Sequence, residues 1–259
     1  MKWNDIFCNT FKALRVQISP EVKRQIDFML PSKPMIEACR ANDLDYFQPF
    51  IAAGKLSVDD MHQACDRYYL GKTKTGTPIF WMIDDLHRPL DAHIGTTWIS
   101  TLLKHREPLI NSWHVEHCLF GLHLMANNGD LTGDRSACEH LRSNTGPVPS
   151  VSLSPISIVE SESSAIVLSA LFPESIWMAY ATTSHLSPDL FSPLEGHIVT
   201  IYPRTDPTLS NYLFFQDLIN LTLQRYDLDL TLDTTLEDHA TAEQKDRCID
   251  LLDYLKESL

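Results

Sequence analysis

The sequence predicts an α/β protein, in which a domain with a small parallel sheet follows a smaller α+β domain. From residue 156 onward, short apolar runs of strand length alternate with helix-length segments, which is typical of parallel sheets with crossover helices. The earlier part is mostly helical around one β-rich hairpin. Residues 127–155 are rich in Asn, Gly, Ser, Asp and Pro and predict a polar linker or loop. We therefore expect domains over residues 1–126 and 156–259.

In the N-terminal domain, the spacing of apolar residues first predicts helices. They cover residues 21–30, residues 42–53, and a segment that starts at the capping-box pair Ser57 and Asp60. Residues 78–83 form a β-rich run, and residues 84–87 predict a turn into a return strand. Residues 112–125 are expected to form a buried helix or a strand–helix junction.

The C-terminal domain is expected to alternate strands with helices. Strands are predicted at 156–159, 177–181, 197–202 and 227–233, and helices at about 162–171, 188–194, 209–224 and from the capping-box pair Thr241 and Gln244 to Leu255. The acids of residues 227–233 alternate with leucines, so they are better explained as the solvated face of a strand than as a ligand set. A short helix is also possible at 136–142.

The net charge of −13 is concentrated at the C-terminal end, where the last 33 residues hold ten acids and three bases. Because phosphate contacts dominate nucleic-acid affinity, an acidic chain is a poor candidate for tight binding to DNA or RNA. A local basic patch remains possible. Its members, the nucleic-acid-binding candidates, are Lys72, Lys74, Arg88, Lys104 and Arg106.

Localisation follows from what the chain lacks. No apolar run approaches the roughly 20 residues needed to span a bilayer, and residues 1–5 are polar where a signal peptide needs an apolar stretch. The six cysteines include no C-x-x-C pair, which favours free thiols over a zinc ribbon or a disulfide framework. We expect a soluble, cytoplasmic protein with no membrane partner.

Acidic residues follow two of the predicted strands. Glu160 and Glu162 come directly after residues 156–159, and Asp206 follows residues 197–202. The carboxyl ends of parallel strands are where open α/β sheets hold ligands. Glu160 and Asp206 could therefore lie side by side, as a hard divalent cation would need.

Histidines also suggest a metal site. His114, His117 and Cys118 are spaced to share one face of a helix, and His123 lies farther along. No acid or histidine elsewhere at recognisable spacing completes such a site. We therefore favour buried histidines that are satisfied by ordinary hydrogen bonds.

Seven short segments in this order resemble the toprim-bearing, primase-like proteins of bacterial mobile elements and, more distantly, the catalytic core of the bacterial replicative primase. The resemblance covers roughly residues 65–255. The segments are YLGKTK at 69–74, IFWMID at 79–84, CLFGLHL at 118–124, VESE at 159–162, WMAYAT at 177–182, YP at 202–203 and IDLLDYL at 249–255. The resemblance implies a toprim-like, Rossmann-like C-terminal domain that follows a primase-core-like N-terminal domain in the sequence.

The resemblance also implies site residues. Glu160 matches the toprim glutamate that acts in proton transfer or metal binding, and Asp206 matches the second acid of the Asp-x-Asp that holds magnesium. Glu160, Glu162 and Asp206 are thus the catalytic candidates, and Glu160 and Asp206 the metal ligands. Paired carboxylates neutralise a Mg²⁺ or Mn²⁺ ion, which then polarises a phosphoryl group.

The chain departs from the family pattern at the positions that matter most for chemistry. Arg204 stands where the family has the first Asp of the Asp-x-Asp, and Ser163 and Ser164 replace a lysine and a threonine. Thr183 and Ser184 replace a glycine pair, so close backbone approach to a phosphate is less available. The guanidinium of Arg204 keeps its charge at any accessible pH. We expect it to pair with the acids and block the metal site.

Three functions follow as alternatives. In the first, a catalytically impaired primase-like protein acts through nucleic-acid or protein contacts in mobile-element replication, regulation or defence, with a helicase, nuclease or defence component as partner. In the second, a working Mg²⁺- or Mn²⁺-dependent nucleotidyltransferase or nuclease uses Glu160. The third is a structural subunit without a ligand. An Arg204 paired inward favours the first, and one pointing outward favours the second.

Overall fold

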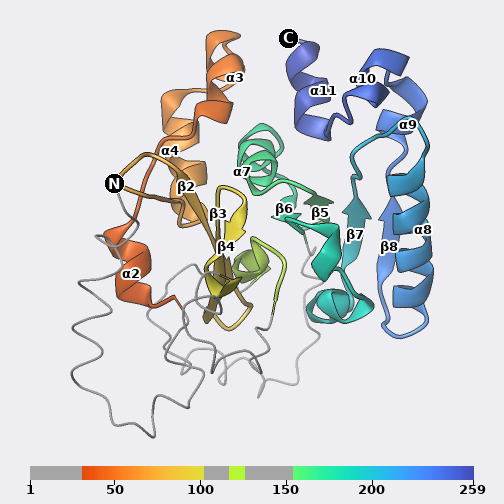
Figure 1. Cartoon of the computed structure of the whole chain (residues 1–259), viewed down its shortest axis with the longest axis horizontal. Coiled ribbons are helices and arrows are strands. Elements are labelled where there is room, and N and C mark those ends of the chain that lie inside the picture. The colour runs from red at the N-terminus through yellow and green to blue at the C-terminus, as the bar shows by residue number, and fades with distance from the viewer. Residues whose placement is uncertain (1–30, 102–116, 126–153) are drawn as a thin grey trace, which may run out of the picture.

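The structure is a computed structural model that describes residues 31–101, 117–125 and 154–259. It holds two four-stranded sheets, an antiparallel one in the N-terminal half and a parallel one in the C-terminal half. Figure 1 shows the two sheets side by side, with helix α7 (Glu162–Leu171) near the centre. The predicted α/β class with a small parallel sheet is confirmed. The expected helices at 21–30 and 136–142 lie outside the described residues.

The N-terminal half builds its antiparallel sheet in the order β1-β2-β3-β4. Its elements are α2 (Lys33–Ala38), the 3₁₀ helix η3 (Asp45–Phe47), α3 (Gln48–Ala52), α4 (Val58–Arg67), β1 (Gly71–Lys72), β2 (Pro78–Ile83), β3 (Pro89–Ile94) and β4 (Thr97–Trp98). The capping box of Ser57 and Asp60 starts α4 as predicted. Strand β2 is buried on both faces: Trp81 packs toward the core that includes α2, and Phe80 toward the core shared with α4 and α7.

The prediction of a single helix over residues 42–53 is wrong. Leu44 is extended, η3 follows it, and α3 begins only at Gln48 with Pro49 in its first turn. Proline has no backbone N–H and clashes with the preceding turn, so a helix tolerates it only near its start. Pro49 therefore divides the segment.

Residues 117–121 are also not helical, so His117 and Cys118 do not share a helix face; His114 lies outside the described residues. Phe120 instead pairs antiparallel with Ala179 at the edge of the parallel sheet, and the 3₁₀ helix η5 (Leu122–Met125) follows. Gly121 makes this turn possible with a φ of +87°, where an added Cβ would lie 2.9 Å from the Trp177 carbonyl oxygen. The junction alternative is the one that fits.

The C-terminal half is a parallel sheet in the order β6-β5-β7-β8. Besides α7, its elements are β5 (Ile156–Val159), β6 (Ile176–Ala179), η7 (Thr183–His185), η8 (Pro188–Leu194), β7 (Ile198–Ile201), α8 (Ser210–Leu223), β8 (Asp229–Leu232), α9 (Thr235–His239), α10 (Ala242–Asp246) and α11 (Leu251–Glu257). Val159 packs with α7, while Ile158 packs with α8 and η8 on the opposite face. None of the helices in the described ranges is long and apolar enough to cross a membrane.

The predicted last helix is in fact two helices. The capping box of Thr241 and Gln244 starts α10 as expected, but Cys248 has a φ of +52° and interrupts the helix. Asp250 then caps α11 by accepting a hydrogen bond from the Asp253 N–H at 2.9 Å. A short acceptor side chain ahead of an apolar pair favours a new helix start over continuation.

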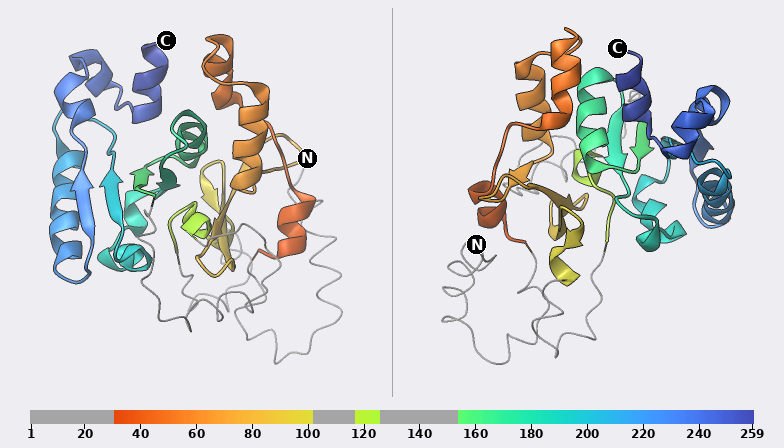
Figure 2. Two further views of the ribbon diagram at one scale, coloured as in Figure 1. Left: turned by 180° about the vertical axis from the view of Figure 1, so that it is seen from behind. Right: turned by 45° about the horizontal axis from the view of Figure 1, so that its top comes forward.

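The arrangement defines two sides of the molecule. The carboxyl ends of β7 and β8 point toward the region of α9, α10 and α11 (Figure 1). Helix α8 lies at the outer side of the parallel sheet, away from α2, α3 and α4 (Figure 2). The strand-end residues and the outer face of α8 are therefore different surfaces.

Candidate functional site at the carboxyl ends of the parallel strands

The site is formed where the central strands of the parallel sheet end. Glu160 follows β5, Arg204 and Asp206 follow β7, and Asp250 lies at the start of α11. Parallel strands bring their carboxyl ends to one edge of the sheet. The sequence correctly predicts the location of Glu160, Arg204 and Asp206 and the pairing of Arg204 with Glu160, but not Asp250 or the partners of the other acids.

Glu160 forms an ion pair with Arg204. The Arg204 Nε lies 2.8 Å from the Glu160 Oε2, without the alignment of a hydrogen bond. The Glu160 side chain is 24% exposed and that of Arg204 is 43% exposed. Burial raises the pKa of Glu160, the Arg204 charge counteracts this, and Asp250 and Glu162 raise the pKa further. A fixed cation thus lies beside the carboxylate that a metal ion would need.

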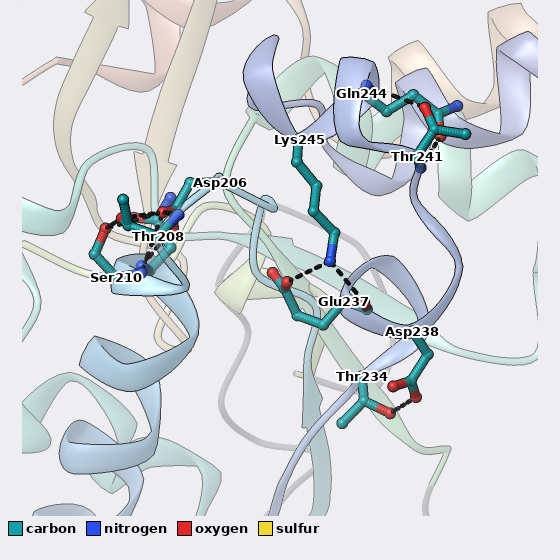
Figure 3. Close-up of polar contacts among 10 residues, drawn as sticks. Asp206, Thr208, Ser210, Thr234, Glu237, Asp238, Thr241, Gln244 and Lys245 are labelled. Atoms are coloured by element: carbon teal, nitrogen blue, oxygen red, sulfur yellow. Dashed lines mark hydrogen bonds and ion pairs between the residues drawn. The ribbon is translucent and has the colours of Figure 1, made fainter.

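Asp206 binds the start of α8 instead. Its Oδ1 accepts hydrogen bonds from the backbone N–H and hydroxyl groups of Thr208 and Ser210, and its Oδ2 accepts one from the Asn211 N–H at 2.8 Å. Figure 3 shows this arrangement around Asp206. Burial alone would raise the pKa of Asp206, but these hydrogen bonds outweigh it and hold the pKa well below its ordinary value. The carboxylate acts as a helix cap.

Glu162 makes a contact between the two halves of the chain. Its Oε1 lies 2.7 Å from the Nδ1 of His93 on β3, and both side chains are largely buried. The His93 ring stacks on Trp98, with ring centroids 4.9 Å apart. The hydrogen bond to Glu162 raises the pKa of His93, burial opposes this, and the charges of Glu162 and Asp91 add to the rise. Glu162 is therefore paired with a histidine.

We expect the pKa of His93 to fall in a Glu162→Gln variant, because the hydrogen bond that His93 donates to Glu162 is the main cause of its rise. In the wild-type protein, this pair stabilises the fold fully below the unfolded pKa near 6.5. It loses that contribution as the pH rises through the higher folded pKa. An NMR titration of the imidazole resonances measures the pKa directly. Glu195→Gln is the control, since Glu195 contacts Asp227; an unchanged His93 pKa in Glu162→Gln would contradict the assignment.

Asp250 is a site residue that the sequence reasoning missed. Its Oδ2 accepts a hydrogen bond from the Ser164 hydroxyl at 2.5 Å, so α7 and the start of α11 are joined beside Glu160. The available signal was an aspartate immediately before the apolar pair Leu251 and Leu252, which is typical of a helix N-cap.

The basic candidates do not gather into one free patch within the described ranges. Lys72 forms an ion pair with Asp43, and the Arg88 Nε lies 2.6 Å from the Asp84 Oδ2. Lys74 is exposed in the hairpin between β1 and β2. Lys104 and Arg106 lie outside the described residues. Two of the three described cations thus have an acidic neighbour that offsets their charge.

The described residues contain no group of three His, Cys, Asp or Glu side chains arranged to hold a metal ion. Among the histidines, His123 is buried, and its Nε2 lies 3.2 Å from the carbonyl oxygen of Arg67. Burial lowers the pKa of His123 to about 4, so the ring is neutral at pH 7. His123 is therefore buried as expected but only half satisfied, because its Nδ1 has no hydrogen-bond partner among the described residues.

The comparisons with known proteins add one finding. A family model described as a domain of unknown function, DUF6371, matches residues 148–205. The match spans Glu160, Glu162 and Arg204 and ends one residue before Asp206. No curated protein matches the chain. The matched segment therefore includes the ion pair at the strand ends, and the description of the family names no activity.

Proposed function

We propose that this chain is a divergent primase-like toprim protein whose metal site has been replaced by an ion pair. It acts through protein or nucleic-acid contacts in mobile-element replication, regulation or defence. The observation that carries this proposal is the 2.8 Å contact between Arg204 and Glu160. An arginine cannot lose its charge at accessible pH, so it competes with a divalent cation for the carboxylate.

The other acids do not fit a Mg²⁺ or Mn²⁺ ion either. Such ions need several oxygen ligands directed at one point. Glu162 is paired with His93, and both carboxylate oxygens of Asp206 accept hydrogen bonds from the first turn of α8. Each acid is satisfied by a different neighbour. This supports a scaffold role over phosphoryl transfer.

A protein is the proposed partner in preference to nucleic acid. The net charge of −13 opposes binding to phosphates, and Lys72 and Arg88 are paired with Asp43 and Asp84. A helicase, a nuclease or a defence component of the same element is the class of partner that the toprim resemblance favours. These contacts do not require a working metal site.

Metal binding tests the proposal. We expect calorimetric titration of Mn²⁺ or Mg²⁺ to show no binding to the wild-type chain and to show binding to Arg204→Asp, which removes the cation and supplies a carboxylate beside Glu160. Adding Glu160→Ala to that variant should abolish the binding. Arg225→Asp is the matched control, because Arg225 is also an exposed arginine in an ion pair, with Asp189.

The opposite pattern supports the enzyme alternative. If the wild-type chain binds Mn²⁺ and both Glu160→Ala and Asp206→Ala abolish that binding, the scaffold proposal is wrong. Primer-synthesis and nuclease assays would then be the next measurements, with Glu160→Ala as the inactive reference.

A further inference from the structure

Helix α8 presents an apolar stripe to solvent. Leu213, Phe214 and Leu221 are 53%, 39% and 49% exposed. The opposite face of the helix packs into the core of the parallel sheet through Phe215 and Leu218. At 3.6 residues per turn, positions 213, 214 and 221 lie on one side of the helix. Such an exposed apolar group on a surface helix is a candidate contact surface.

The stripe carries a single charge at its centre. Asp217 lies four residues after Leu213, three after Phe214 and four before Leu221, so all three apolar side chains surround it. It is the only charged residue in the 14-residue helix. Arg225, just beyond the helix, is held by Asp189, whose Oδ1 lies 3.1 Å from its Nη1. The stripe is therefore apolar with a negative centre.

Phe214, the aromatic residue of the stripe, is held in place by ring contacts with residues beneath it. The ring of Phe214 lies edge-on to the buried ring of Phe215, with centroids 5.3 Å apart, and Phe215 in turn packs against Tyr180 at 5.1 Å. A side chain that is held in place before binding loses less entropy on contact. Anchors of this kind contribute much of the binding energy at interfaces.

The negative charge of Asp217 determines which kind of partner fits the stripe. A second copy related by a two-fold axis through the stripe would bring Asp217 beside its own counterpart, and each chain has a net charge of −13. An anionic membrane surface would be repelled in the same way. A helix with apolar residues at three- and four-residue spacing and a central Lys or Arg would match both the apolar side chains and Asp217. We propose that the stripe of Leu213, Phe214, Asp217 and Leu221 docks a cationic amphipathic helix of another protein.

This inference does not depend on the state of Glu160, and binding of a model helix tests it. The probes are two fluorescently labelled amphipathic peptides, one built from leucine and lysine and one from leucine and glutamate, titrated into the full chain. We expect the lysine peptide to bind and the glutamate peptide not to bind. Phe214→Ser should weaken the lysine peptide about tenfold or more. Asp217→Lys should weaken it by about fivefold and allow the glutamate peptide to bind.

Matched controls separate the stripe from general attraction to an acidic protein. Leu223→Ser changes another exposed leucine of α8, outside the stripe, and should leave the affinity unchanged. Equal binding of both peptides, no binding, or insensitivity to Phe214→Ser and Asp217→Lys would overturn the proposal. So would a dimer in sedimentation that Phe214→Ser dissociates, because a second copy would then be the occupant. Strong competition by a peptide of residues 1–30 would assign the stripe to this chain's own N-terminal segment and also overturn it.

Discussion

Phe120→Ala is expected to lower the free energy of unfolding by about 3–5 kcal/mol, the range for removing a fully buried aromatic side chain. The Phe120 ring is stacked on Tyr68 at 5.3 Å and lies edge-on to Phe80 at 5.7 Å. Its backbone exchanges hydrogen bonds of 2.8 and 3.0 Å with Ala179. The residue therefore connects the core of the N-terminal half to the edge of the parallel sheet. Urea denaturation followed by circular dichroism measures the loss.

The chain supplies its own control for this change. Phe214→Ala removes a ring of the same size that is partly exposed on α8, so we expect a far smaller loss of stability. Similar losses for Phe120→Ala and Phe214→Ala would show that residues 117–125 do not pack against β6 as described.

The second large effect is expected for Asp206→Ala, which should lower the free energy of unfolding by about 2–4 kcal/mol at neutral pH. The substitution removes the acceptor for three backbone N–H groups at the start of α8, together with two hydroxyl contacts. Hydrogen bonds to a charged group contribute about 1.5–3 kcal/mol each, and part of this is recovered because Thr208 and Ser210 are exposed, so that water can replace the carboxylate. Asp233→Ala is the matched control, because Asp233 also follows a strand but accepts one such bond, from the Thr235 N–H at 2.9 Å.

The effect of Asp206 should also depend on pH. Its folded pKa lies below the ordinary value of 3.8, so its contribution is complete above that value and is lost as the pH falls through the folded pKa. The stability difference between the wild-type chain and Asp206→Asn should therefore shrink as the pH is lowered below about 4. A difference that stays constant down to acid pH would show that the ionised carboxylate is not what stabilises α8.

The strand pattern of the C-terminal half could be predicted because each strand is a short apolar run between turn residues. Capping boxes were equally informative: Ser57 with Asp60 and Thr241 with Gln244 both start helices where expected. The errors came from residues whose effect depends on position within an element. A proline is tolerated in the first turn of a helix, as Pro49 is in α3. The same residue in the interior of a helix would break it.

The location of the site and the pairing of Arg204 with Glu160 could be predicted, but the partners of the other acids could not. The carboxylates of Glu160 and Asp206 do follow neighbouring strands, as the alternation of strands and helices indicates. Asp206 contacts residues just after it in the sequence, but the partners of Glu162 and Asp250 come from far away. His93 reaches Glu162 from the other sheet, and Asp250 reaches Ser164 from the last helix. Periodicity carries no information about such long-range pairs.

The position of helix α7 limits which parts of this chain can be exchanged for those of a relative. Residues 162–169 are all buried, because α7 packs against the N-terminal helices on one side and the parallel sheet on the other. One hydrophobic core therefore contains residues from both halves, such as Met82 and Val159. A gene exchange that joined one half to the other half of a relative would leave α7 against a surface that it did not evolve with. Such an exchange is therefore expected to destabilise the chain, because closely packed cores tolerate mismatched surfaces poorly.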